Sequence, residues 1–155
     1  MIHPLLLATA IIAPEPAAAS FDSLKTFVGT WRAQRPGGRV VEIAYRQTAG
    51  GTVLTETWTL SPTRESVTVY HRDGRDLLAT HYCPIGNQPR LRLASGDPRR
   101  LRFAFKDATD LATGESHLHA FGIDLLGPDR VVRTETYREN GKPATETLVF
   151  DRVKT

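Results

Sequence analysis

Apolar and polar residues alternate with a period of two along most of the chain after Trp31. This pattern is typical of strands that bury one face and expose the other. It is clearest in two segments, where one parity holds Leu54, Trp58 and Leu60, and Leu101, Phe103 and Phe105. The pattern predicts ten strands, near residues 30–35, 39–46, 52–60, 65–71, 76–83, 90–95, 101–106, 117–125, 130–138 and 144–152.

Turn-forming residues separate these segments at nearly every gap. Asp73-Gly74 and Asn140-Gly141, for example, are typical of tight hairpins. Regular spacing without intervening helices favours an all-β fold, an up-and-down antiparallel barrel of about ten strands, which leaves no exposed sheet edge. A short N-terminal helix precedes it, with Ser20 as its cap and Gly29 at its end.

The N-terminus predicts export. An apolar run over residues 5–12 is followed by Pro14, Pro16 and three alanines at 17–19, so we interpret residues 1–19 as a signal peptide and expect a periplasmic or secreted protein. The run is too short to span a bilayer, which takes roughly 20 apolar residues. The alternative is an N-terminal tail that docks on the core or stays disordered. Residues 20–155 form a single domain.

The helix running into Gly29-Thr30-Trp31, followed by a meander of strands, resembles the calycin barrels, the lipocalins and their relatives. The resemblance implies that Trp31 packs over a closed barrel end against an arginine from a late strand, Arg152 or else Arg138. The chain also resembles uncharacterised bacterial exported proteins that carry a His-Tyr-Cys…Gly-Asn-Gln-Pro-Arg segment, here residues 81–90. That second resemblance implies no activity.

Charge and cysteine content narrow the function classes. The formal net charge is +3, and five arginines lie between residues 90 and 102. No aromatic residues interleave with these arginines, so we expect no nucleic-acid partner. The single cysteine, Cys83, forms no internal disulfide.

Polar residues at strand positions that are predicted to face the barrel lumen suggest a pocket. Glu56 lies between Leu54 and Trp58, and a buried carboxylate needs a partner or a ligand. We therefore predict a barrel that binds a small, partly apolar and possibly lipophilic molecule in its lumen, with no cofactor. The predicted ligand-binding residues are Glu56, Trp58, His81, Cys83, Asn87, Gln88 and His119.

Two alternatives stay open. If His81, Cys83, His117 and His119 share the lumen, they suit an enzyme or a metal site with nitrogen and sulfur ligands. Otherwise the barrel is filled by its own side chains and serves a structural or interaction role. Arg133, Glu135 and Glu146 are interpreted as a solvated ladder on the outer surface.

Overall fold

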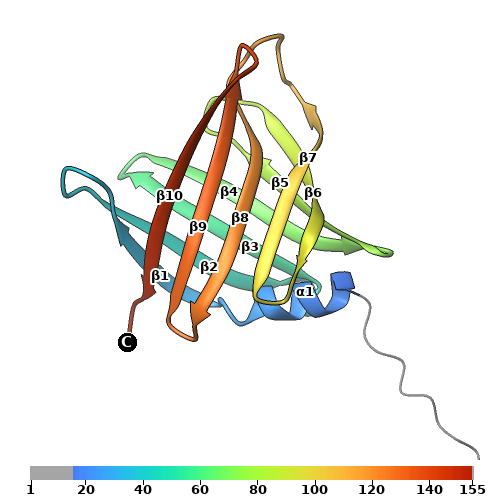
Figure 1. Ribbon diagram of the computed structural model, residues 1–155, viewed down its shortest axis with the longest axis vertical. Coiled ribbons are helices and arrows are strands. Elements are labelled where there is room, and N and C mark those ends of the chain that lie inside the picture. The colour runs from blue at the N-terminus through green and yellow to red at the C-terminus, as the bar shows by residue number, and fades with distance from the viewer. Residues whose placement is uncertain (1–15, 155) are drawn as a thin grey trace, which may run out of the picture.

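The structure, a computed structural model, describes residues 16–154 as one helix and ten strands (Figure 1). The helix α1 spans Pro16–Lys25, and a short 3-10 turn, η1, spans Ala49–Gly51. The strands are β1 (Gly29–Gln34), β2 (Val40–Thr48), β3 (Val53–Ser61), β4 (Arg64–Asp73), β5 (Asp76–Tyr82), β6 (Gln88–Asp97), β7 (Arg100–Thr109), β8 (His117–Gly127), β9 (Arg130–Glu139) and β10 (Lys142–Arg152).

The strands form a closed antiparallel barrel in which each pairs with its sequence neighbours and β1 pairs with β10. The predicted fold class, an up-and-down barrel of ten strands with a short N-terminal helix, is confirmed. In Figure 1 the helix α1 lies across one end of the barrel, and the β9–β10 hairpin projects at the other. We call these the closed end and the open end.

The helix begins at Pro16, about one turn earlier than Ser20, where the sequence suggested a cap. Proline is favoured in a first helical turn because its missing N–H has no partner there in any case. Ala17, Phe21 and Leu24 are buried, and the helix packs against β4, β5 and β6. Residues 1–15 of the predicted signal peptide lie outside the described residues, while residues 16–19 belong to α1. Cleavage behind residue 19 would remove Ala17 from the core.

Trp31 and Arg152 cover the closed end. The Arg152 guanidinium lies 4.2 Å from the centroid of the Trp31 ring and donates to the carbonyl oxygens of Val28 and Thr26 at 2.9 and 2.8 Å. Gly29 has φ +126°, and a Cβ there would come within 3.3 Å of the same guanidinium. The Gly-x-Trp pattern thus has a local physical basis, and the prediction of Arg152 as the stacking partner is confirmed.

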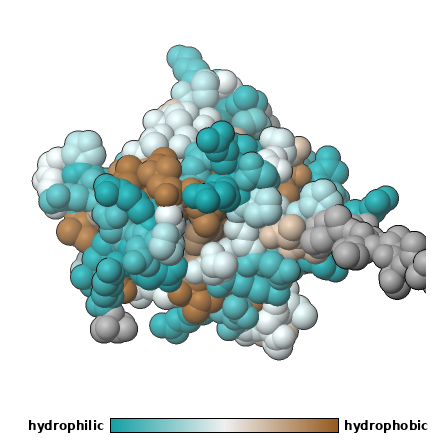
Figure 2. Space-filling view, turned by 60° about the horizontal axis from the view of Figure 1, so that its bottom comes forward, coloured by the Kyte–Doolittle hydropathy of each residue, from teal (hydrophilic) through white to brown (hydrophobic). Residues whose placement is uncertain are grey.

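Side chains fill the lumen from the closed end to the middle of the barrel. Phe27 contacts Trp31 and Tyr45 at 5.8 and 5.5 Å between ring centroids, and Phe103 stacks on Phe121 at 4.5 Å. The surface around the closed end is mostly hydrophilic, with hydrophobic residues in small separate patches (Figure 2). Among the described residues no helix is long and apolar enough to cross a membrane.

The seam that closes the barrel is short. β1 and β10 pair only at Trp31 with Arg152 and at Arg32 with Asp151, whereas β1 and β2 pair along the whole of β1. Beyond these two pairs an ion pair bridges the seam, with 2.6 Å between Arg35 Nη2 and Glu146 Oε2. The barrel wall is therefore joined by side chains, rather than by backbone, towards the open end.

The Arg152 contacts predict a large stability effect. Arg152→Ala should lower the free energy of unfolding by about 3 kcal/mol, because it removes a cation–π contact and several charge-assisted hydrogen bonds to carbonyls. Urea denaturation followed by tryptophan fluorescence measures it. Arg130→Ala is the control, since Arg130 pairs with Asp151 on the surface and should change stability by less than about 1 kcal/mol. Equal effects would contradict the role given to Arg152.

Candidate functional site

A cavity of about 610 Å³ lies at the open end, within the range usual for small-molecule sites. Its walls come from the β1–β2 turn, the adjoining ends of β3 and β4, the segment after β5, the residue before β8, and the strands β9 and β10. It is lined by Arg35, Arg39, Trp58, Leu60, Ser61, Arg64, Ser66, Cys83, Pro84, Ile85, Ser116, Glu135, Tyr137, Ala144, Thr145 and Glu146. Of the predicted ligand-binding residues, Trp58 and Cys83 line this cavity.

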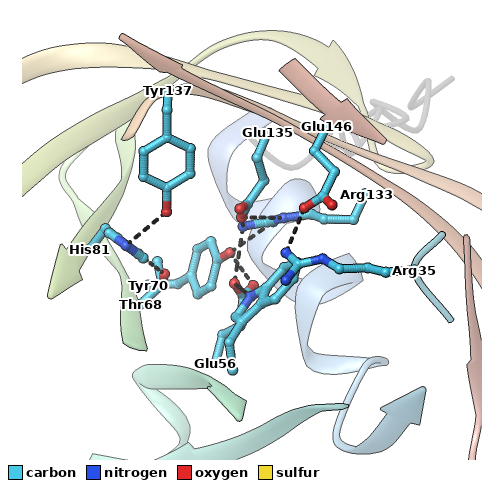
Figure 3. A network of polar contacts seen from close by, with 10 residues as sticks. Arg35, Glu56, Thr68, Tyr70, His81, Arg133, Glu135, Tyr137 and Glu146 are labelled. Carbon is cyan, nitrogen blue, oxygen red and sulfur yellow. Dashed lines mark hydrogen bonds and ion pairs between the residues drawn. The ribbon is translucent and has the colours of Figure 1, made fainter. Parts of the chain in front are cut away.

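Glu56 is fully buried and fully hydrogen-bonded (Figure 3). Its Oε1 accepts from Trp58 Nε1 at 2.7 Å and from Arg133 Nη2 at 3.0 Å, and its Oε2 accepts from the Tyr70 hydroxyl at 2.5 Å. Burial raises the pKa of Tyr70, which therefore keeps its proton for this bond. Glu56 thus holds the network together beneath the cavity and does not line it.

Arg133 is shared between two carboxylates. Besides the bond to Glu56, its Nε and Nη2 donate to Glu135 Oε1 at 3.3 and 3.1 Å, and its guanidinium lies 4.0 Å from the Phe121 ring centroid. Burial alone would lower the pKa of Arg133, but the negative charges of Glu56 and Glu135 hold that pKa above its ordinary value. One cation therefore faces two acids in the lumen.

The interpretation of Arg133 and Glu135 as part of a solvated outer ladder is wrong. The side chain of Arg133 is 1% exposed and that of Glu135 13% exposed. Burial raises the pKa of Glu135, against the lowering effect of Arg133, and the charges of Glu56 and Glu146 raise it further. Glu146 does reach the surface, but from the cavity mouth, where it pairs with Arg35.

A sequence signal marks these acids. The tripeptide Thr-Glu-Thr occurs three times, at residues 55–57, 134–136 and 145–147. On β9 and β10 the flanking threonines bond across the strands, Thr134 with Thr147 at 3.1 Å and Thr136 with Thr145 at 2.9 Å. Because neighbours alternate in direction, each glutamate points to the opposite face, the lumen side. The repeated tripeptide could have identified Glu135 and Glu146 together with Glu56.

His81 is buried below the cavity, where a hydroxyl faces each ring nitrogen. Thr68 Oγ1 lies 3.0 Å from Nδ1, and the Tyr137 hydroxyl lies 3.5 Å from Nε2. A hydroxyl can donate or accept, so either neutral tautomer is satisfied. Burial lowers the pKa of His81 to about 4. His81 is therefore neutral at pH 7 and positions Tyr137, which lines the cavity.

The segment after β5 forms one wall of the cavity. Cys83 lies just beyond the end of β5, where burial raises the pKa of its thiol. Its backbone N–H donates to the Asn87 carbonyl at 3.1 Å, and Asn87 Nδ2 donates to the Ser116 carbonyl at 2.9 Å. Gln88 accepts from Thr109 at 2.6 Å. Asn87 thus ties this segment to the β7–β8 connection and Gln88 ties it to the end of β7, and neither residue lines the cavity.

His117 and His119 lie in a different cluster. Their rings pack against Phe105, with centroids 5.2 and 5.4 Å away. The register of β8 against β9 shifts between Leu118 and Ala120, a bulge that breaks strict alternation and buries Leu118. Within residues 16–154 no group of three or more histidine, cysteine or acidic residues is arranged to hold a metal. The four residues of the metal alternative are not brought together.

The shared arginine predicts a strong effect of removing one acid. Glu56→Gln should destabilise the protein by about 3 kcal/mol, because it takes a full negative charge from a buried guanidinium. Chemical denaturation measures the change. Asp124→Asn, which removes the partner of the surface residue Arg102, is the matched control and should cost less than about 1 kcal/mol. A similar small cost for both would contradict the central role of Glu56.

The environment of His81 predicts a dependence of stability on pH. Between about pH 6.5 and pH 4 the unfolded chain binds a proton on this imidazole while the folded protein does not, so stability falls as pH falls through that window. The loss from this group is about 3 kcal/mol and ends below its folded pKa. Urea midpoints measured from pH 8 to pH 4 should show a shallower decline for His81→Gln. Parallel curves would contradict the prediction.

Comparisons with known proteins show the fold. No family model matches the chain, and no curated protein matches it in sequence. Among solved structures, a protein of unknown function from the DUF3598 family of Nostoc punctiforme is similar, with a TM-score of 0.58 and 15% sequence identity. The match covers 84% of this chain and 49% of that protein, so the chain spans about half the length of the protein it resembles. At this identity the match shows similarity of fold alone, to a protein whose function is also unknown.

Proposed function

We propose that this barrel binds a small, partly apolar molecule in the cavity at its open end. The observation that carries the proposal is the division of the lumen into a filled part and a hollow part. Aromatic side chains fill the closed end, whereas the open end holds a cavity of about 610 Å³ with Trp58, Leu60 and Ile85 beside polar side chains. Apolar walls with a few placed polar groups are typical of ligand sites.

The structure gives better support to binding than to a catalytic reaction that uses Cys83 and His81. A nucleophilic thiol needs a lowered pKa, and burial raises the pKa of Cys83 instead. Both ring nitrogens of His81 already face hydroxyl partners, Thr68 and Tyr137. We further propose export of the protein to the periplasm or the medium, supported by the apolar run at residues 5–12, and N-terminal sequencing of the mature protein tests this.

A cavity-filling variant tests the binding proposal. Ala144 lines the cavity and pairs with Tyr137 across β9 and β10, so Ala144→Trp should occupy the mouth and reduce ligand binding at least about tenfold. Native mass spectrometry of protein from its own host, with extraction of small molecules, is the measurement. Thr147→Trp on the outer face of the same strand is the control, since its neighbour there is Thr134.

The two variants separate the possible results. Loss of a co-purified molecule in Ala144→Trp, with retention in Thr147→Trp, would support the proposal. A wild-type protein that carries no small molecule, or an equal load in both variants, would contradict it.

A further inference from the structure

We propose that the cavity binds a ligand with a positively charged nitrogen, such as an amine, and that Glu135 receives that nitrogen. The inference deepens the proposed function and rests on it. It starts from the sharing of one guanidinium by two acids, because Arg133 is the one cation bonded to both Glu56 and Glu135 among the described residues.

The two acids, Glu56 and Glu135, differ in how many hydrogen bonds their carboxylate oxygens accept. Glu56 accepts three hydrogen bonds, through both carboxylate oxygens. The bonds to Glu135 come from Arg133 and reach Oε1, and within residues 16–154 no bond reaches Oε2. Glu135 also lines the cavity, whereas Glu56 lies beneath it. Glu135 therefore lines the space where a ligand would lie and has one acceptor oxygen with spare capacity.

The surroundings of Glu135 favour a cation. Glu146 lies directly across from it in the β9–β10 register, and Glu56 is bonded to the same guanidinium. These two neighbours and burial all disfavour the charged form of Glu135, and Arg133 offsets this only in part. A ligand ammonium would supply the missing positive charge and a charge-assisted hydrogen bond. The Tyr137 hydroxyl oxygen, two residues along β9, provides a second acceptor on the same face.

The cavity also defines the rest of the ligand. Trp58, Leu60 and Ala144 offer apolar contact between the floor and the mouth. Arg39 and Arg64 lie at the mouth and are exposed, so salt screens their charges more than that of the enclosed Glu135. The class that fits is an amine with an apolar body, its nitrogen innermost.

Titration with phenethylamine and its neutral isostere 2-phenylethanol, followed by ¹⁵N NMR, tests the inference. The chain has two tryptophans, so the indole signals report on two places. Trp58 lines the cavity and donates its indole N–H to Glu56, while Trp31 lies at the closed end as an internal control. Phenethylamine should shift the Trp58 signal and bind at least about tenfold more tightly than the alcohol.

Variants assign the preference to Glu135. Glu135→Gln should bring the amine close to the affinity of the alcohol, and Glu135→Asp, which retains the charge, should keep part of the preference. Glu146→Gln is the matched control, because Glu146 is already paired with Arg35 and is 44% exposed. Equal loss in Glu146→Gln and Glu135→Gln would overturn the assignment to Glu135.

The outcomes separate the two proposals. If the alcohol binds wild-type protein as tightly as the amine, the cavity is a binding site and the charge preference is wrong. If neither compound moves the Trp58 signal at millimolar concentration, both the charge preference and the binding proposal are contradicted.

Discussion

The shared guanidinium of Arg133 is the interaction on which the middle of this barrel depends. It lies where the apolar lumen ends and the cavity begins, bonded to Glu56 below and Glu135 above. A charge at such depth is tolerated only with close partners, and this one has two carboxylates, a phenol and the face of Phe121. The position of these partners on β3, β4, β8 and β9 means that the network also fixes the relative positions of strands on opposite walls.

The two ends of the barrel use arginine side chains in different ways. At the closed end Arg152 turns its charge towards backbone carbonyls and its flat face towards Trp31, so a cation seals an apolar core. At the open end Arg35 pairs with Glu146 across the seam and leaves space beneath. An arginine therefore closes one end by stacking on a tryptophan ring, and another arginine borders the open end through an ion pair. The lumen between them passes from apolar to charged along a single axis.

The sequence predicted the architecture better than the site, for reasons that particular residues illustrate. Strand alternation and turn residues are local, so ten strands could be inferred without coordinates. The Trp31–Arg152 contact was implied by the resemblance to the calycin barrels. The partners of Glu56 could not, because cross-strand register and non-neighbouring walls decide them; Arg133 lies 77 positions away in sequence. The alternation rule was wrong at His119. One extra residue in β8 changes which side chains point into the lumen on either side of it. Asn87 and Gln88 are among the predicted ligand-binding residues, whereas their side-chain hydrogen bonds lead to Ser116 and Thr109.

The short β1–β10 seam gives this barrel a property that a uniformly paired wall would lack. The other neighbouring strands share longer backbone ladders, whereas two paired positions leave most of β10 without β1 as a neighbour. An ion pair between flexible side chains can lengthen or re-form at little cost, since it depends on no ladder geometry. The girth of the barrel at its mouth is thus less constrained at the β1–β10 seam than along the β9–β10 hairpin, whose strands stay paired to the turn between them.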